Sequence, residues 1–435
     1  MNDNNENNEI TYELYEPYDQ YDQYEAYKKH YNSSILTNRI VFFALGLFVG
    51  AMLTLTITIA STQIRNYLVW GSSLPPENKI LEIYNVLDTH SIVPVDRNVL
   101  LTNMYRGLLE GVDDPYSYYF NSESLSVFME RTDGSYVGVG MAVILDTEIN
   151  RVVITTVFTG APAETAGLLP GDIIIAVDDT DTTTYSTDEV ASLVRGVPDT
   201  DVTLRILRGD TILTFTITRR QVHIPTVSHR IIDDNIGYLR IESFDGVTVA
   251  QFSDAFDDLR SQNIAGLIID VRNNPGGLLD TVISIGDILL PIGSIMYSED
   301  SQGERTAYLS ETDNILDIPL VMLVNGGSAS ASEVLTGAVR DHGVGVVVGE
   351  QTFGKGVVQR LFPLSDGSAI RATVARFYTP NGTSIHEDGI TPDFIVEVDR
   401  ETAMAAARLT LEEDIQLQKA LQVVQGNIST FSIGG

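Results

Sequence analysis

Residues 319–359 restrict the possible folds of this chain more than any other stretch. The run Pro319–Val324 is apolar and short enough for a buried strand, and a turn follows at Asn325–Gly327. From Ser332 onward the apolar residues recur at helical spacing, and Val344–Val348 is a second strand-like run. This order of strand, turn, helix and strand predicts an α/β unit built on a sheet.

Three small hydroxyl residues occupy the turn of this unit. Ser328, Ser330 and Ser332 alternate with alanines at the point where the strand gives way to the helix. A tight strand-to-helix turn exposes a hydroxyl, and the free N–H groups of the helix N-terminus stabilise a developing oxyanion. The turn is therefore a candidate site for a nucleophilic serine, although spacing alone does not choose among the three.

A serine hydroxyl is a weak nucleophile and needs a general base. Lys355 lies between Gly354 and Gly356, just before the apolar run Val357–Val358. Apolar surroundings without an adjacent carboxylate lower the pKa of a lysine, which can then act as a neutral base. Ser–Lys pairs are a known variant of the catalytic triad, so Lys355 is the candidate base.

Two other interpretations use the same stretch. Asp341 and His342 allow a Ser–His–Asp arrangement, although His342 falls at the expected end of a helix, where histidine is common. Gly349–Lys355 also fits the G-x-x-x-x-G-K pattern of a phosphate-binding loop. Gly356 replaces the Ser or Thr that binds Mg²⁺ there, and a strand follows instead of a helix, which disfavours this second interpretation.

The first 60 residues differ in composition from the rest. Residues 1–39 are rich in Asn, Tyr and acidic side chains and have too few aliphatic residues for a core, which predicts a disordered tail. Ile40–Ala60 contains no charged residue and is long enough to cross a hydrocarbon core of about 30 Å as a helix. The basic residues on its N-terminal side (Lys28, Lys29, Arg39) outnumber those after it, which places the tail in the cytoplasm and the body outside.

Composition excludes several classes of function. The chain has no cysteine, so disulfides, thiol chemistry and cysteine-based zinc sites are ruled out. Its formal net charge of -32 argues against nucleic-acid binding, which needs a basic face.

Residues 132–222 consist of short apolar runs between turns, with helical pieces at Ala161–Ala166 and Thr187–Val194. Tyr136-Val-Gly-Val-Gly140 resembles the carboxylate-binding loop of PDZ domains, and Ala161-Pro-Ala-Glu-x-Ala-Gly167-Leu-x-Pro-Gly-Asp172 resembles the bacterial PDZ signature. The N–H groups of such a turn bind a terminal carboxylate, and the adjoining strand edge pairs with an extended peptide. The resemblance implies that a peptide C-terminus binds at Tyr136, Val137, Gly138, Val139 and Gly140.

Four ordered motifs carry a wider resemblance, over residues 77–423. They are Asp270-Val-Arg-Asn-Asn-Pro-Gly-Gly-Leu278, Gly327-Ser-Ala-Ser-Ala-Ser-Glu333, Gly349-Glu-x-Thr-Phe-Gly-Lys355-Gly-x-x-Gln359 and Pro380-x-Gly-x-Ser-Ile385-x-x-x-Gly389-Ile-x-Pro-Asp393. Together with the PDZ motifs, they resemble the C-terminal processing peptidases, or tail-specific proteases, of serine peptidase family S41.

This resemblance implies roles for individual residues. Ser330 matches the nucleophile, Lys355 the general base, and Gln359 the side chain that orients the lysine. The N–H groups of Gly276 and Ala331 match the oxyanion hole, whose two donors stabilise a tetrahedral intermediate.

Two further residues have alternative roles. Some relatives use an acid at the position of Asp341, so the third catalytic role is open between Gln359 and Asp341. Arg195 matches an arginine that relatives use to control access to the active site when the PDZ module docks a substrate; a surface salt bridge is the alternative.

The resemblance implies a membrane-anchored serine endopeptidase that captures a free, often apolar, protein C-terminus. It would cut through an acyl-enzyme, with no metal ion, nucleotide or other cofactor, and relatives with such helical ends often form homo-oligomers. One alternative is a catalytically silent PDZ scaffold that only binds peptides. The other is the Ser–His–Asp hydrolase described above.

The expected fold is multidomain, with a mixed-sheet α/β protease core, a PDZ domain, a helical region and one transmembrane helix. The expected parts are a tail (1–39), a transmembrane helix (40–60), a linker (61–76), a helical region (77–131), a PDZ domain (132–222), the peptidase core (223–400) and a C-terminal helix with its tail (401–435).

Overall fold

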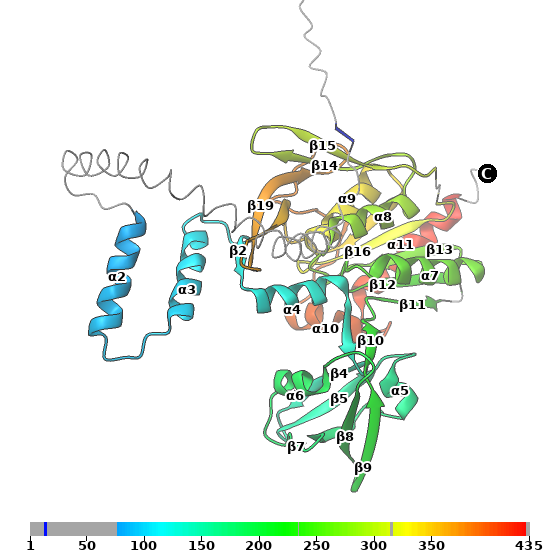
Figure 1. The fold of residues 1–435 in the computed structure, drawn as a ribbon. Coiled ribbons are helices and arrows are strands. Elements are labelled where there is room, and N and C mark those ends of the chain that lie inside the picture. The colour runs from blue at the N-terminus through cyan, green and yellow to red at the C-terminus, as the bar shows by residue number, and fades with distance from the viewer. Residues whose placement is uncertain (1–12, 15–75, 234, 314–315, 432–435) are drawn as a thin grey trace, which may run out of the picture. The chain divides into compact units, whose positions relative to one another are not determined.

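The structure is a computed structural model that describes residues 13–14, 76–233, 235–313 and 316–431 (Figure 1). The chain forms two compact units. The first contains the described parts of Met1–Pro17, Glu123–Val358 and Val374–Gly435, and the second those of Tyr18–Ser122 and Gln359–Thr373. The predicted tail (apart from Glu13–Leu14), the predicted transmembrane run Ile40–Ala60 and the linker up to residue 75 lie outside the described residues. Within the described residues, no helix combines the length and the apolar character needed to cross a membrane.

A six-stranded sheet forms the centre of the first unit, in the order β11-β12-β13-β16-β17-β20. Its strands are β11 (Val227–Ile232), β12 (Ile236–Ile241), β13 (Gly266–Asp270), β16 (Leu320–Val324), β17 (Gly345–Gly349) and β20 (Phe394–Ile395). Neighbours are parallel from β12 to β20, whereas β11 is antiparallel to β12. This mixed sheet confirms the predicted α/β class.

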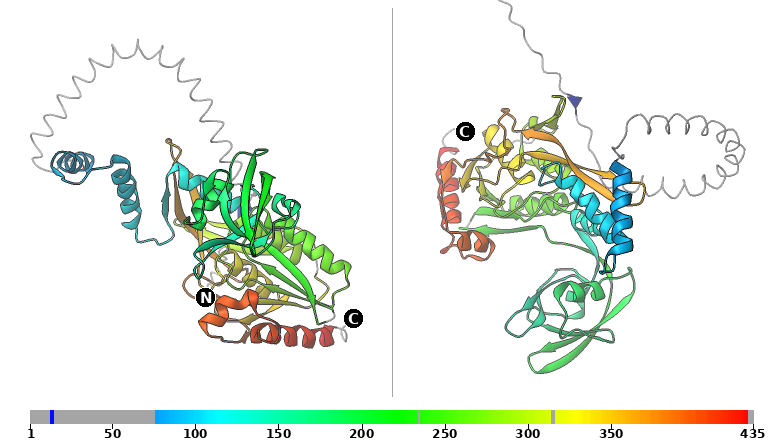
Figure 2. Two further views of the ribbon diagram at one scale, coloured as in Figure 1. Left: turned by 90° about the horizontal axis from the view of Figure 1, so that it is seen from below. Right: turned by 90° about the vertical axis from the view of Figure 1, so that its left-hand side faces the viewer.

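Helices cover both faces of this sheet. Successive side chains of a strand point to opposite sides, and the strands here are apolar at both sets of positions. Leu239, Ile269 and Met322 pack in one core with α7 (Thr248–Ser261), α8 (Leu279–Leu289) and α9 (Ala331–Asp341). Their neighbours, including Tyr238, Ile268 and Val321, pack against α11 (Ile415–Phe431), which is red in Figure 2. Burial on both faces explains why β13 and β16 are continuous apolar runs in the sequence.

A second group of strands borders the central core. In the first unit, β14 (Gly293–Asp300) pairs antiparallel with β15 (Arg305–Ser310) and with the C-terminal part of β19 (Ala369–Tyr378). The short strand β1 (Glu13–Leu14) pairs with β15. The first unit also contains α10 (Arg400–Ala405), the 3₁₀ helix Ala406–Arg408 and the first two residues of β18 (Val357–Pro363), whose remaining residues belong to the second unit.

The PDZ module has a five-stranded sheet in the order β4-β5-β6-β8-β9, and β7 (Thr180–Asp181) pairs with β6. The strands are β4 (Met141–Asp146), β5 (Arg151–Val157), β6 (Ile173–Val177), β8 (Asp201–Arg208) and β9 (Thr211–Thr218). The helices α5 (Pro162–Ala166) and α6 (Thr187–Val194) lie where the sequence predicts helical pieces. The strands β3 (Ser135–Gly138) and β10 (Arg220–His223), which border the module in the chain, pair antiparallel.

The second unit contains α2 (Pro76–His90), α3 (Arg97–Glu110) and β2 (Tyr118–Phe120), and α4 (Ser122–Asp133) leads into the first unit. β2 pairs antiparallel with residues Ala369–Arg371 of β19. Asp96 caps α3 by accepting hydrogen bonds from the N–H groups of Asn98 and Val99. Apolar side chains of α2, such as Leu81 and Ile83, are exposed within this unit.

Candidate active site

Two neighbouring parallel strands end side by side and bring their following turns together. Asp270, the last residue of β13, is opposite Leu323 of β16, and the N–H of Val271 donates to the Leu323 carbonyl at 2.9 Å. Residues 271–278 leave β13, and Asn325–Ser330 leave β16. The first and second predicted motifs therefore meet at the carboxyl edge of the sheet.

The three serines of the second turn have different surroundings. The Ser328 hydroxyl donates to the Val271 carbonyl at 2.8 Å, the Ser332 hydroxyl donates to the Asn274 carbonyl at 2.9 Å, and both side chains are buried. Ser330 is only half-buried and directly precedes α9. Its φ of 55° and ψ of -113° are unfavourable for an L-residue, a strain typical of functional positions. These surroundings favour Ser330 as the nucleophile over the other two serines.

Gly276 approaches Ser330 so closely that only glycine fits. Its φ is +100°, and an added Cβ would lie 2.8 Å from the Ser330 Cβ and 2.9 Å from the Ala331 nitrogen. Ala331 is the first residue of α9, where N–H groups have no partner within the helix. The two predicted oxyanion donors thus lie beside the candidate nucleophile, Ser330, but the N–H of Gly276 donates to Asn274 Oδ1 at 2.9 Å.

A buried carboxylate, to which the sequence patterns assign no role, joins the backbones of Ser330 and Lys355. Glu333 Oε2 accepts hydrogen bonds from the N–H groups of Ser330 (2.8 Å) and Lys355 (2.9 Å). Its Oε1 accepts from the N–H of Gly354 (2.7 Å) and the hydroxyl of Thr352 (2.6 Å). The spacing Ser-x-x-Glu at the start of a helix, a capping-box pattern, was the available sequence signal.

Glu333 has a raised pKa because it is fully buried; the hydrogen bonds from Thr352, Gly354, Ser330 and Lys355 oppose this shift without cancelling it. Four hydrogen-bond donors therefore stabilise the buried carboxylate. The carboxylate sets the distance between the two backbone segments that carry Ser330 and Lys355.

The remaining predicted residues lie in three different places. Asp341 is the last residue of α9, roughly 15 Å along the helix from Ser330. Its Oδ2 accepts from the N–H of Asn381, and His342 Nε2 contacts the Ser294 carbonyl at 2.8 Å. Gln359 belongs to the second unit, where its Nε2 donates to the Tyr116 carbonyl at 2.5 Å. The structure does not bring Asp341 to Ser330.

In the PDZ module, Tyr136, Val137 and Gly138 lie on β3, and the buried Val139 and Gly140 follow. Gly140 has a φ of +84°, and a Cβ there would lie 2.3 Å from that of Ala161, which accounts for glycine at this position. Burial raises the pKa of Tyr136. The sheet edge at β4 is unpaired on one side within the module, as peptide binding by strand addition requires.

Arg195 lies beside this loop, directly after α6. Its guanidinium stacks over the Tyr136 ring, 5.1 Å from the ring centroid, and its Nη1 is 3.4 Å from Glu130 Oε2 on α4. Both members of this ion pair are about half exposed, so the pair itself contributes little stability. Arg195 thus contacts the predicted carboxylate loop and the helix that precedes it.

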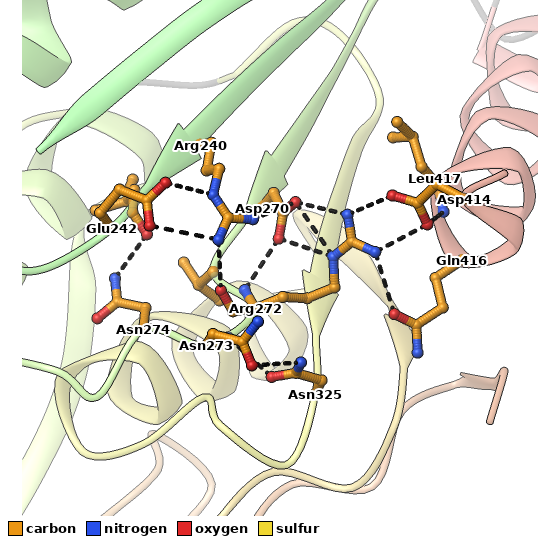
Figure 3. A network of polar contacts seen from close by, with 12 residues as sticks. Arg240, Glu242, Asp270, Arg272, Asn273, Asn274, Asn325, Asp414, Gln416 and Leu417 are labelled. Atoms are coloured by element: carbon orange, nitrogen blue, oxygen red, sulfur yellow. Dashed lines mark hydrogen bonds and ion pairs between the residues drawn. The ribbon is translucent and has the colours of Figure 1, made fainter. Parts of the chain in front are cut away.

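A buried ionic network lies under the turn that follows β13 (Figure 3). Asp270 accepts hydrogen bonds from Arg272, Arg240 and Tyr238, and Arg272 also contacts Asp414. Burial alone would raise the pKa of Asp270, but the guanidinium groups of Arg272 and Arg240 hold it at about 2.

Comparisons with known proteins identify the family of this chain. The profile of peptidase family S41 matches residues 235–396, and that of the PDZ domain matches residues 153–208. A carboxyl-terminal-processing protease of Synechocystis sp. is 34% identical over 408 residues, covering 90% of this chain and 95% of the relative. A chloroplastic C-terminal processing peptidase of Tetradesmus obliquus is 36% identical over 71% of this chain and 70% of the relative.

Among solved structures, a putative S41 protease from Bacteroides fragilis has the same fold, with a TM-score of 0.50 and 17% identity over 82% of this chain and 99% of that one. The family profile and these relatives identify the chain as a serine-type peptidase. The chain belongs to the carboxyl-terminal-processing proteases of peptidase family S41.

Proposed function

We propose that the protein cleaves polypeptides with a Ser330–Lys355 dyad. The observation that carries the proposal is the Glu333 carboxylate, which binds the N–H groups of both residues next to Gly276 and Ala331. The Ser330 Oγ attacks the scissile carbonyl carbon while Lys355 Nζ takes the hydroxyl proton and passes it to the leaving amine. A water molecule then hydrolyses the acyl-enzyme by the same route.

The N–H groups of Gly276 and Ala331 donate to the oxyanion in both steps. Because the Gly276 N–H donates to Asn274 Oδ1, the oxyanion competes with that side chain for the donor. Gln359 is the proposed third group, four residues after Lys355 on the chain. The place of Asp341 at the far end of α9 argues against it as an auxiliary group.

The PDZ module is proposed to capture the free C-terminus of the substrate. The carboxylate binds the loop Tyr136–Gly140, and the peptide backbone pairs with the edge of β4. Arg195 stacks on Tyr136 and pairs with Glu130, so a bound carboxylate competes with Glu130 for the guanidinium. This competition supports a gating role for Arg195, because substrate docking would then weaken the contact between Arg195 and Glu130 on α4.

The proposal places the protein at a membrane. Ile40–Ala60 anchors the chain as a single-pass helix, with residues 1–39 cytoplasmic and the catalytic body extracytoplasmic, because the basic residues gather before the helix. This topology excludes the pairing of β1 with β15, because the two strands would lie on opposite sides of the membrane. Exposed apolar side chains on α2 and α3, such as Ile83, Val86 and Leu108, support contact with a second copy of the chain. The proposed domain boundaries are those expected from the sequence: the helical region 77–131, the PDZ domain 132–222, the peptidase core 223–400 and the C-terminal part 401–435.

An unfolded reporter with a free apolar C-terminus tests the proposal, with an amidated reporter as its matched control. We expect the parent protein to cut the free reporter, to cut the amidated one more slowly, and the K355A variant to cut neither, as followed by intact mass. Equal cleavage of both reporters would remove carboxylate capture. A protein that binds C-terminal peptides but never reacts with a fluorophosphonate probe would be the silent scaffold.

A further inference from the structure

The turn that carries Gly276 is tied to a residue more than a hundred positions downstream. Arg272 starts this turn, and its guanidinium is almost completely buried, with 1% of the side chain exposed. Its Nη1 donates to Asp414 Oδ1 at 2.9 Å, and its Nη2 donates to Asp414 Oδ2 at 2.7 Å (Figure 3). Such a bidentate pair fixes both the distance and the orientation of the two groups.

Asp414 is itself held in place at the start of α11. Its Oδ1 accepts from the N–H of Leu417 at 2.9 Å, and its carbonyl accepts from the N–H of Gln418. Gln416 Oε1 accepts a further hydrogen bond from Arg272 Nη1 at 3.1 Å. Two side chains at the start of α11 therefore present three acceptor oxygens to one guanidinium.

The backbone around Arg272 is fixed at consecutive residues. The Arg272 N–H donates to Asp270 Oδ1, and its carbonyl accepts from Arg240 Nη2. The next residue, Asn273, donates its N–H to Asn325 Oδ1 and its Nδ2 to the Ala403 carbonyl. The second of these bonds also reaches the C-terminal segment, so the turn has two independent contacts with it.

We propose that Asp414 is a positioning residue for peptide cleavage, which acts through Arg272 to hold the Gly276 turn against Ser330. The inference rests on the proposed function, because it assigns a purpose to the turn only if Gly276 serves the oxyanion. The four buried charges Arg240, Arg272, Asp270 and Asp414 balance. Removing the Asp414 charge takes one of the two carboxylate partners from the buried Arg272 and lets its guanidinium shift.

The test is the D414N substitution in the full-length protein. Asparagine keeps the size and the helix-capping ability of the side chain but removes its charge. We expect kcat on the free-C-terminus reporter to fall about 10- to 100-fold, as for a small misplacement of a catalytic group, with an unchanged KM. We also expect slower fluorophosphonate labelling of Ser330 and an unchanged affinity for a C-terminal peptide, which a general loss of structure would not leave intact.

D172N is the matched control. Asp172 is buried in the PDZ module, pairs with Arg208 at 2.6 Å through Nε and accepts a backbone hydrogen bond from the N–H of Leu169. This variant also removes the charge of a buried carboxylate that pairs with an arginine, but we expect its Ser330 labelling rate to match that of the parent. The melting temperatures of D414N and D172N show whether each variant is folded at the temperature of the assay.

The Q416L variant tests the same inference if D414N does not fold. It removes one neutral acceptor from Arg272 and keeps the ion pair, so we expect a smaller fall in kcat with the same KM. A folded D414N or Q416L protein with the parental kcat and labelling rate would overturn the inference. Failure of the parent itself to cleave or label would instead refute the proposed function.

Discussion

The Glu333 carboxylate lies 2.9 Å from the backbone nitrogen of Lys355, although 22 residues separate them in the sequence. The same oxygen accepts the N–H of Ser330, so one buried atom joins the backbones of the proposed nucleophile and base. These hydrogen bonds use the backbone N–H groups of both residues, so they constrain the main chain.

Replacing either member of the dyad should abolish cleavage. We expect S330A and K355A each to lower kcat/KM by at least about 10³-fold, because the two groups act as a unit. H342A should keep parental activity, since its ring contacts the Ser294 carbonyl at the far end of α9. The measurement is reporter cleavage by intact mass. An inactive H342A with an active K355A would instead establish a Ser–His–Asp hydrolase.

E333Q should impair catalysis more than folding. Each Glu333 oxygen accepts two hydrogen bonds, so the amide nitrogen of glutamine leaves two buried donors without an acceptor. We expect a loss of about 1–3 kcal/mol in the free energy of unfolding and a fall in kcat of about 10- to 100-fold. Urea unfolding and steady-state kinetics measure the two effects.

E350Q is the control for this prediction. The Glu350 carboxylate accepts a hydrogen bond from the backbone N–H of Val398, a residue outside the segments that carry Ser330 and Lys355. We expect it to keep the parental kcat. An E333Q protein as active as E350Q would show that the shared carboxylate is not needed to position the dyad.

G276A should separate steric fit from backbone strain. A Cβ at Gly276 would lie 2.8 Å from the Ser330 Cβ, so we expect kcat to fall at least about 10²-fold, as when an oxyanion donor is lost. G303A is the matched control, because Gly303 has a similar φ of +83° but nothing within 4 Å of the added Cβ. G303A should lose about 1 kcal/mol of stability without losing activity. Equal kcat values for the two variants would contradict the steric explanation.

Asp270 should make the stability of the protein depend on acid pH. Its folded-state pKa of about 2 lies below the ordinary value of 3.8, so the fold favours its ionised form. That contribution is fully present above about pH 4 and is lost as the pH falls from about 4 to 2, which corresponds to about 2 kcal/mol. The stability gap between the parent and D270N in urea should therefore narrow over this range. A gap that stays constant would show that the charge of Asp270 is not stabilised by its arginines.

Several features could be predicted from the sequence because they depend on short-range patterns. The apolar runs at β13 and β16 predict buried strands, and helical spacing after Ser330 predicts α9. Ordered motifs likewise identify the family and the PDZ module, since each one requires particular residue types at fixed spacing.

Other features depend on which segments the fold brings together, and local patterns carry no such information. The sequence presents three alternating serines as equivalents, and only tertiary packing buries the hydroxyls of Ser328 and Ser332 against neighbouring carbonyls. Packing also places Asp341 at the end of α9 away from Ser330, and it makes Glu333 and Asp414 partners of distant residues. The sequence by itself determined the family, the elements and the candidate dyad. The tertiary structure alone decided which side chains share a hydrogen bond, because such bonds require contact within about 3 Å between segments far apart on the chain.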